Sequence, residues 1–143
     1  MNKIEEAMRL AYEYHEGKLY GNEPYINHLL RVHSSVWLAG WGEKCQIVAL
    51  LHDIVEDTDI DYPFLYEKFG AEITSAIKAI TRKEDETYFD YIRYSVMNNE
   101  IARVVKFFDL MENLEHCYLN KSYSDLVSRY KKALELIAIG DAK

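Results

Sequence analysis

The sequence predicts an all-α fold, and three observations support this. Apolar residues recur at the three- and four-residue spacing of helices along almost the whole chain, and no segment alternates with the period of a strand. Two prolines and six glycines in 143 residues leave few breaks between helices. The length fits one hydrophobic core, and 49% hydrophobic with 29% charged residues is ordinary for a globular protein. We therefore expect a single helical bundle over residues 1–143.

The N-terminal half is expected to contain four helices. Ile4 and Met8 fall on one stripe of a first helix that ends near Gly17, before a turn-rich stretch. Pro24 suits the start of the second helix, where a missing backbone N–H costs little. Gly70 is expected to end the fourth helix. The four predicted ranges are about 4–17, 24–39, 43–54 and 64–69.

The C-terminal half carries the same pattern. Ile73, Ile77 and Ile80 lie on one side of an amphipathic segment, and a charged loop over 82–86 follows it. Ser124 is a suitable N-cap for the last helix. The predicted ranges are about 71–81, 87–97, 101–118 and 124–139. The last helix either closes the bundle or forms a seam between two copies of the chain, which leaves a homo-oligomer open.

The charge balance and the apolar runs exclude several classes of partner. There are 17 Lys and Arg against 24 Asp and Glu, a net charge of −7, whereas a general binder of nucleic-acid polymers needs a basic surface. The longest apolar run, 47–51, is too short to span a membrane, and the N-terminus carries acids where a signal peptide has an apolar segment. Cys45 and Cys117 are too few for a disulfide framework and suit a reducing compartment. We expect a cytoplasmic protein without a membrane partner.

Four residues of ligand or acid–base type gather within six positions, in the string HDIVED at 52–57. The His52-Asp53 pair ends an apolar helix, where a buried imidazole and carboxylate need partners. If helical spacing continues, Glu56 lies one turn beyond His52, and Asp57 one turn beyond Asp53. These groups would repel one another unless a cation lay between them. The string therefore indicates a metal site.

Two further ligand candidates lie on neighbouring apolar helices. His28 comes early in the second predicted helix, and Asp109 interrupts the apolar run 104–111. Buried acids in such runs are rare unless they are paired or coordinated. Taken singly, each of the two is more simply a hydrogen-bonded core residue. Together with the His52-Asp53 pair, they favour a site of two imidazoles and two carboxylates.

The motifs occur in an order that resembles a known family. Residues 25–28 read YINH, residues 49–58 read ALLHDIVEDT, and residues 105–114 read VKFFDLMENL. This order, over about residues 7–117, resembles the HD-domain hydrolases of the RelA/SpoT-homologue type, specifically the stand-alone small alarmone hydrolases. The HDxxEDT string is the most specific part. The resemblance implies a helical HD-domain bundle, a nucleotide substrate and release of the 3′-pyrophosphate of (p)ppGpp.

The resemblance also implies roles for single residues. The implied ligands of one divalent metal ion, usually manganese in this family, are His28, His52, Asp53 and Asp109. Imidazole and carboxylate donors with open water positions suit such an ion. The pair implied to position and activate the attacking water is Glu56 and Asp57. The implied substrate contacts are Lys106 and Asn113. We also expect Tyr25 at the substrate, because it is adjacent to His28, and Lys18, which lies in a stretch that is usually basic in the family. His15, at the end of the first helix, either lines the pocket or, more simply, lies on the surface or behind the ligands.

The sequence departs from the family pattern at positions near the expected substrate rather than at the expected metal ligands. The arginine and histidine that usually follow the aspartate are Leu110 and Glu112 here, and Leu29 stands where a proline is common. Lys18 is the one cation of a stretch that is usually basic. Two alternatives therefore stay open: an HD-domain hydrolase of another phosphorylated nucleotide, and a non-catalytic nucleotide-binding module on the same fold.

Overall fold

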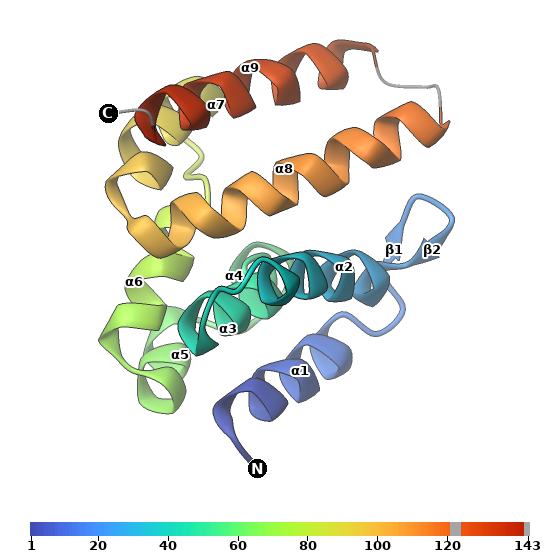
Figure 1. Ribbon diagram of the computed structural model, residues 1–143. Helices are drawn as coiled ribbons and strands as arrows, with labels where there is room; N and C mark the ends of the chain where they lie inside the picture. The colour runs from blue at the N-terminus through green and yellow to red at the C-terminus, as the bar shows by residue number, and fades with distance from the viewer. Residues whose placement is uncertain (121–123, 142–143) are drawn as a thin grey trace.

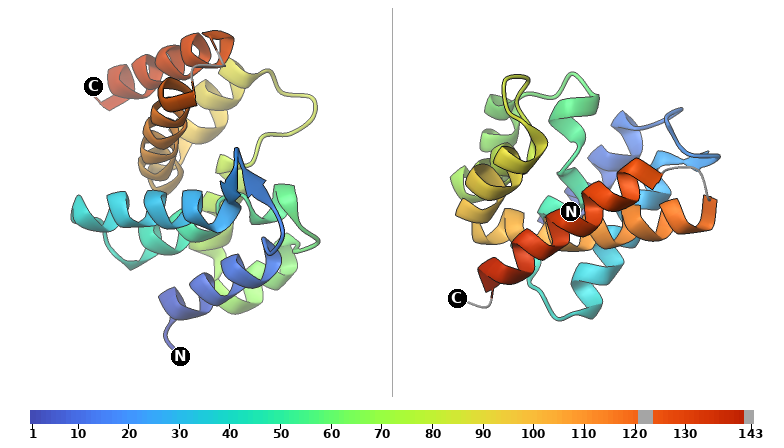
Figure 2. Two further views of the ribbon diagram at one scale, coloured as in Figure 1. Left: turned by 90° about the vertical axis from the view of Figure 1, so that its right-hand side faces the viewer. Right: turned by 90° about the horizontal axis from the view of Figure 1, so that it is seen from above.

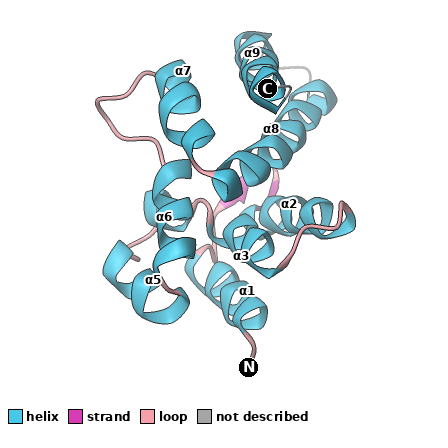
Figure 3. Ribbon diagram, turned by 60° about the vertical axis from the view of Figure 1, so that its left-hand side comes forward, coloured by secondary structure: helices cyan, strands magenta, loops and turns pink. Residues whose placement is uncertain are grey.

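The structure is a computed structural model that describes residues 1–120 and 124–141. It confirms the all-α prediction, because the strands of the described residues form only one short hairpin among the helices (Figure 3). The helices are α1 (Lys3–Tyr14), α2 (Tyr25–Leu38), α3 (Glu43–Leu51), α4 (Ile54–Asp57), α5 (Tyr62–Phe69), α6 (Ala71–Ile80), α7 (Tyr88–Asp90), α8 (Glu100–Asn120) and α9 (Ser124–Asp141). A π-helical segment, η1 (Tyr91–Ser95), and a 3₁₀ turn, η2 (Val96–Asn98), follow α7, and the hairpin is β1 (Leu19–Tyr20) with β2 (Glu23–Pro24).

Helix α8 runs through the middle of the molecule (Figure 1). It packs against α2 and α3 on one side and against α9 on another, and α1 lies against α3. Figure 2 shows α8 and α9 as a layer above α2 and α1. The main core cluster includes residues 47–51 of α3, all of which are fully buried. A smaller cluster joins α8 to α9 through Leu110 and Ile137. No helix of the described ranges has the length and apolar character that crossing a membrane requires.

The turn-rich stretch after α1 contains a hairpin that helical periodicity does not predict. Helix α1 ends at Tyr14 rather than near Gly17, which adopts a φ of 82°. The two strands are antiparallel, with Tyr20 opposite Glu23, and Gly21 makes the turn with a φ of 61°. Strands of two residues are too short to show alternation in a sequence. The hairpin brings Tyr20 to the start of α2.

The predicted helix over 43–54 is interrupted at the His–Asp pair. Helix α3 ends at Leu51, and Asp53 has a φ of −104° and a ψ of 2°, outside helical geometry. The ring of His52 donates a hydrogen bond from Nδ1 to the carbonyl of Ala49 at 2.7 Å. The side chain thus satisfies a carbonyl at the helix end that would otherwise lack a partner. Helix α4 restarts directly after this break.

The predicted helix over 87–97 is helical from Tyr88 to Asn98, but only α7 is α-helical, and the rest is π-helical or 3₁₀. The hydroxyl of Tyr91 donates to the carbonyl of Ile80, and Oγ of Ser95 donates to the carbonyl of Ala79 at 2.6 Å. These bonds tie the segment to the end of α6. Tertiary contacts therefore decide the π-helical and 3₁₀ geometry, which local propensity does not reveal.

The other predicted helices agree closely with the structure. Helix α5 begins earlier than predicted, because Asp61 accepts a hydrogen bond from the amide of Phe64 at 3.0 Å and so caps the helix. Gly70, with a φ of 88°, ends it as expected.

Candidate metal centre

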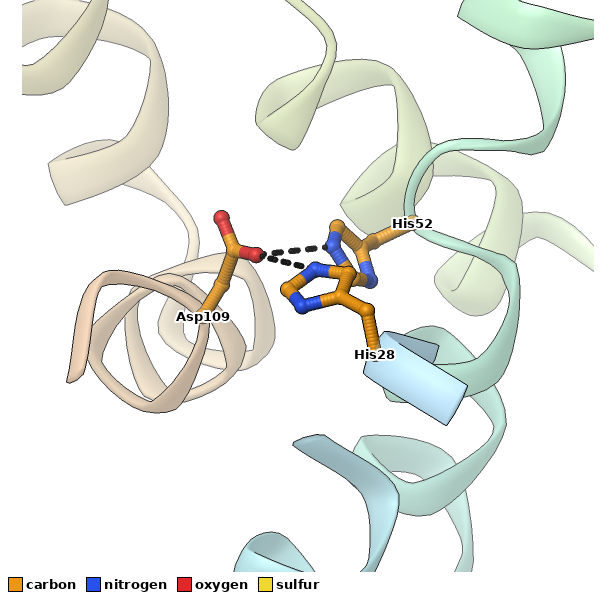
Figure 4. A group of neighbouring side chains, drawn as sticks. All are labelled: His28, His52 and Asp109. Atoms are coloured by element: carbon orange, nitrogen blue, oxygen red, sulfur yellow. Dashed lines mark hydrogen bonds and ion pairs between the residues drawn. The ribbon is translucent and has the colours of Figure 1, made fainter. Parts of the chain in front are cut away.

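Three buried side chains from three helices converge at the centre of the molecule. His28 lies on the first turns of α2, His52 directly after α3, and Asp109 in the middle of α8. Their exposed fractions are 1%, 2% and 4%. One ligand atom of each lies within 4.8 Å of the others, a spacing that allows one metal ion to bind all three. Figure 4 shows both rings directed at the carboxylate.

Hydrogen bonds set how the two rings face Asp109. Nε2 of His28 lies 3.0 Å and Nε2 of His52 lies 3.2 Å from the same carboxylate oxygen, Oδ1. Because Nδ1 of His52 donates to Ala49, Nε2 carries the lone pair when that ring is neutral. A lone pair and a carboxylate oxygen repel each other unless a proton or a cation lies between them. Two imidazoles and a carboxylate suit a borderline divalent ion, so these residues fit a divalent metal.

Asp53, the fourth predicted ligand, lies beside the three converging residues. Its Oδ2 is 3.2 Å from Nε2 of His52 and accepts a hydrogen bond from the hydroxyl of Tyr25 at 2.5 Å. Burial acts to raise the pKa of Asp53, but the charge and hydrogen bond of His52 outweigh it and lower that pKa. The carboxyl therefore stays ionised, as a metal ligand must. Tyr25, predicted at the substrate, contacts this predicted metal ligand directly.

The acidic pair lies on the short helix α4, next to Asp53. The amide of Asp57 donates to the carbonyl of Asp53 at 3.0 Å, so these two residues are one helical turn apart, as the spacing predicts. Glu56 has an exposed side chain, and partial desolvation together with the charges of Asp53 and Asp57 raises its pKa. A carboxyl with a raised pKa exchanges its proton closer to neutral pH than an ordinary glutamate does.

Lys106 lies on the opposite side of Asp109 from the histidines. Its Nζ is 3.1 Å from Oδ2 of Asp109, while both rings contact Oδ1. The ring centroids of Tyr91 and Tyr88 lie 5.4 Å and 5.9 Å from the same ammonium. Predicted as a substrate contact, Lys106 thus also neutralises and orients the carboxylate of a predicted ligand.

Cationic side chains gather around Tyr88, next to Lys106. The guanidinium of Arg129 lies 3.7 Å from the centroid of the Tyr88 ring, and that of Arg82 lies 5.9 Å from it. The Tyr88 hydroxyl is buried and has no hydrogen-bond partner in the described part of the chain. Such a group of cations favours an anionic ligand. The sequence did not single out Arg129, because its position depends on how α9 packs beside α8.

Asn113 and Lys18, two predicted substrate contacts, lie near the hairpin. The hydroxyl of Tyr20 donates to Oδ1 of Asn113 at 2.6 Å, and its ring stacks on His28 with centroids 4.4 Å apart and planes 18° apart. Lys18, in the loop before β1, is half-buried, and within 1–120 and 124–141 its side chain makes no hydrogen bond or ion pair. The sequence does not predict Tyr20 at this site, because only the pairing of β1 with β2 brings it to His28.

His15 lies behind the predicted ligands rather than on the surface. It is 2% exposed, and its ring stacks on Tyr25 with centroids 5.2 Å apart. Nδ1 donates to the carbonyl of Ala11 at 3.2 Å, and Nε2 lies 3.8 Å from Oδ2 of Asp57. His15 therefore lies between Tyr25, which contacts Asp53, and Asp57 on α4.

Comparisons with known proteins agree with this geometry. The family model described as an HD domain matches residues 7–106. A guanosine-3′,5′-bis(diphosphate) 3′-pyrophosphohydrolase of Spiroplasma citri is 32% identical over 143 aligned residues, which cover 90% of this chain and 19% of the relative. The protein MESH1 of Drosophila melanogaster, which carries the same enzyme name, is 28% identical over 68% of this chain and 58% of its own length.

A solved structure supports the fold. Its description names a metazoan ortholog of SpoT that hydrolyzes ppGpp, and it superposes with a TM-score of 0.78 at 21% identity. The superposition covers 98% of this chain and 85% of the other. The chain spans about a fifth of the Spiroplasma relative, at 19% of its length, and somewhat more than half of the insect one, at 58%.

Proposed function

This chain belongs to the HD domain family, and we propose that it is a metal-dependent phosphohydrolase that releases the 3′-pyrophosphate of a guanosine nucleotide of the (p)ppGpp type. The observation that carries the proposal is the convergence of His28, His52 and Asp109 on one position, with their ligand atoms within 4.8 Å. The enzyme names of the relatives support the substrate class.

The residues that would hold one divalent ion, for which we propose manganese, are His28, His52, Asp53 and Asp109. When bound, such an ion supplies a water of lowered pKa and neutralises charge on a phosphoryl oxygen. Tyr25 holds Asp53 through its hydroxyl, and Lys106 holds Asp109 through its ammonium. These second contacts fix the ligands before the ion arrives.

Glu56 and Asp57 are the proposed acid–base pair. Glu56 takes a proton from the attacking water, whose oxygen forms a bond to the phosphorus attached to the ribose 3′-oxygen. The bond between that phosphorus and the 3′-oxygen breaks, and the 3′-oxygen gains a proton as pyrophosphate leaves. Asp57, one turn beyond Asp53, orients the water. The raised pKa of Glu56 suits a group that accepts and returns protons near neutral pH.

The proposed substrate contacts combine the predicted residues with the cations around Tyr88. The residues predicted from the sequence are Lys18, Tyr25, Lys106 and Asn113. Arg82 and Arg129 add two guanidiniums beside Lys106, and paired guanidiniums are well suited to phosphate oxygens. The cations of this group thus compensate the negative charge of a phosphorylated nucleotide in a chain whose net charge is −7.

The proposal extends to the compartment and to the organisation of the chain. Cys45 and Cys117 are both free and buried, which supports a reducing cytoplasm. A single domain over 1–143 stays a prediction that limited proteolysis can test. A homo-oligomer stays a prediction that light scattering can test.

The proposed function is tested by incubating the purified chain with guanosine tetraphosphate and Mn²⁺, with and without EDTA, and separating the products by anion exchange. We expect guanosine diphosphate and pyrophosphate in equal amounts, and none with EDTA or with Asp109→Asn. Turnover that persists with EDTA would contradict the metal-dependent mechanism. No turnover by a chain that has bound the metal would contradict the substrate.

Hydrolysis of a different phosphorylated nucleotide is the second candidate. The hydrogen bond between Tyr20 and Asn113 favours this second candidate. It occupies the side-chain amide of Asn113, which the resemblance assigns to the nucleotide. A panel of nucleotides with 3′-phosphate or 3′-pyrophosphate groups decides between the two substrates. A non-catalytic binding module would bind members of this panel without converting any of them.

A further inference from the structure

Glu112 faces the nitrogen of His28 that Asp109 does not contact. The two carboxylates are three residues apart on α8, so one helix presents an acid to each nitrogen of the ring. Oδ1 of Asp109 lies 3.0 Å from Nε2, and Oε1 of Glu112 lies 3.8 Å from Nδ1. Nδ1 is buried and makes no hydrogen bond with any described residue. Glu112 is therefore the acceptor placed to satisfy it.

Arg31 keeps Glu112 at this place. Its Nε donates to Oε1 of Glu112, and its Nη2 donates to Oε1 of Glu23 on the hairpin. The side chain of Glu112 is 12% exposed, whereas that of Arg31 is 43% exposed. A carboxylate can accept about four hydrogen bonds, so the contact with Arg31 leaves Glu112 free to accept from Nδ1 as well.

Tyr20 limits how else the ring of His28 can lie. Its own ring stacks on His28 at 4.4 Å between centroids and is anchored by the hydrogen bond to Asn113. With one face covered, the ring is held between the two acids of α8. Because the position of the ring is fixed in this way, Glu112 can still determine which nitrogen of His28 carries the proton.

We propose that Glu112 is a positioning residue that accepts the Nδ1–H of His28 and thereby turns the Nε2 lone pair toward the metal position. The inference rests on the proposed function, since it takes His28 to be a metal ligand. The carbonyl of Ala49 does the same for His52 at 2.7 Å. The two imidazoles are thus set in the same tautomer by two different acceptors, as second contacts of metal-bound histidines generally do.

The first measurement is the affinity of the full chain for Mn²⁺ by calorimetric titration, without substrate. Glu112→Ala should weaken binding about 10- to 100-fold, the usual loss for such a contact. Glu112→Gln, whose carbonyl still accepts a hydrogen bond, should recover part of the loss. The matched control is Glu115→Gln, which removes the same charge from the same helix and lines the same cavity of about 380 Å³. The Kd of Glu115→Gln for Mn²⁺ should lie within twofold of the wild-type value.

The second measurement is the NMR signal of the His28 Nδ1 proton in the chain loaded with diamagnetic Zn²⁺. We expect a downfield, slowly exchanging proton in the wild type that is lost in Glu112→Ala and kept in Glu115→Gln. Thermal melting without metal confirms that the variants are folded. A structural role alone would leave this proton signal unchanged.

Any of three results with the variant overturns the inference. Glu112→Ala binds the ion as tightly as Glu115→Gln, or the Nδ1 proton does not respond to it, or the variant loses one of two bound ions, which would make Glu112 a ligand itself. A wild-type chain that binds no ion overturns both this inference and the proposed function. A wild-type chain that binds the ion but hydrolyses no nucleotide contradicts the proposed function alone, because affinity is measured without substrate.

Discussion

In both His52 and Asp109, a hydrogen bond to one polar atom of the side chain fixes the direction in which its second polar atom points. Nδ1 of His52 is taken up by Ala49, and Oδ2 of Asp109 by Lys106, which leaves Nε2 and Oδ1 directed at each other 3.2 Å apart. When the His52 ring is neutral, these two atoms are both acceptors, and two acceptors held together in a buried place are destabilising unless a proton or a cation lies between them. At the residue scale, the site is thus preorganised for a positive ion.

Removing a ligand and removing the base should have different consequences. His52→Ala or Asp53→Ala should abolish hydrolysis through loss of the bound metal. Glu56→Ala should keep the metal but lower the rate about 10²- to 10⁴-fold, the usual contribution of a general base. Metal content after dialysis, measured together with the turnover rate, separates the two effects. Equal loss of metal in all three variants would show that Glu56 is not limited to proton transfer.

Arg129 should act on substrate binding rather than on the metal. Arg129→Gln removes the guanidinium that lies 3.7 Å from the centroid of the Tyr88 ring, and with it the charged contact that we propose to a phosphate oxygen. Such contacts contribute about 1.5–3 kcal/mol, so we expect KM to rise about 10- to 100-fold with little change in kcat. Lys131→Gln, an exposed charge on the same helix, is the control. An unchanged KM in Arg129→Gln would remove Arg129 from the substrate contacts.

At the element scale, helical periodicity predicts a helix correctly only where burial of the helix's own apolar face determines its structure. Helices α2 and α8 were predicted closely, because each buries one face in the common core. The break after α3 and the π-helical segment η1 were missed, because a side-chain bond to Ala49 and bonds to the end of α6 decide them. The sequence pattern does not predict these contacts, because it does not show which residues hydrogen-bond to each other.

The hairpin turn offers a prediction at the same scale. Gly21 has a φ of +61°, and a Cβ there would lie 2.7 Å from Cε1 of His116. Gly21→Ala should destabilise the fold by about 1–2 kcal/mol through backbone strain, plus the cost of displacing His116. Gly17→Ala, at a φ of +82° in open space, should show the strain alone. Gly42→Ala, where a Cβ meets nothing within 4 Å and no positive φ occurs, should change little.

Urea unfolding of the three glycine variants measures these differences. The order of stability should be Gly42→Ala, then Gly17→Ala, then Gly21→Ala. Equal stability of the last two would mean that His116 moves aside without cost, and that the close approach of the turn to α8 does not hold the hairpin.

At the scale of the whole molecule, the site exists only where α2, α3 and α8 meet. His28 and His52 are separated from Asp109 by 81 and 57 positions, respectively. The residue types and the family resemblance predict four ligand candidates, His28, His52, Asp53 and Asp109. The sequence could not show that three of them converge while Asp53 stands beside them, nor that Tyr20 covers His28, because these relations arise from the packing of separate elements.

Because the predicted ligands come from three helices, metal binding should stabilise the entire fold. An ion that binds only the folded chain adds about 2.7 kcal/mol at a hundredfold excess over its Kd. For a chain of this size, that corresponds to a rise in Tm of about 5–10 °C. Calorimetric melting with Mn²⁺ should show this rise, and EDTA should reverse it. His52→Ala should lose it, because the ion could then no longer bridge α3 to α2 and α8. The same rise in His52→Ala would mean that the ion stabilises the chain from its acidic surface, and the convergence of the three helices would then not be a metal site.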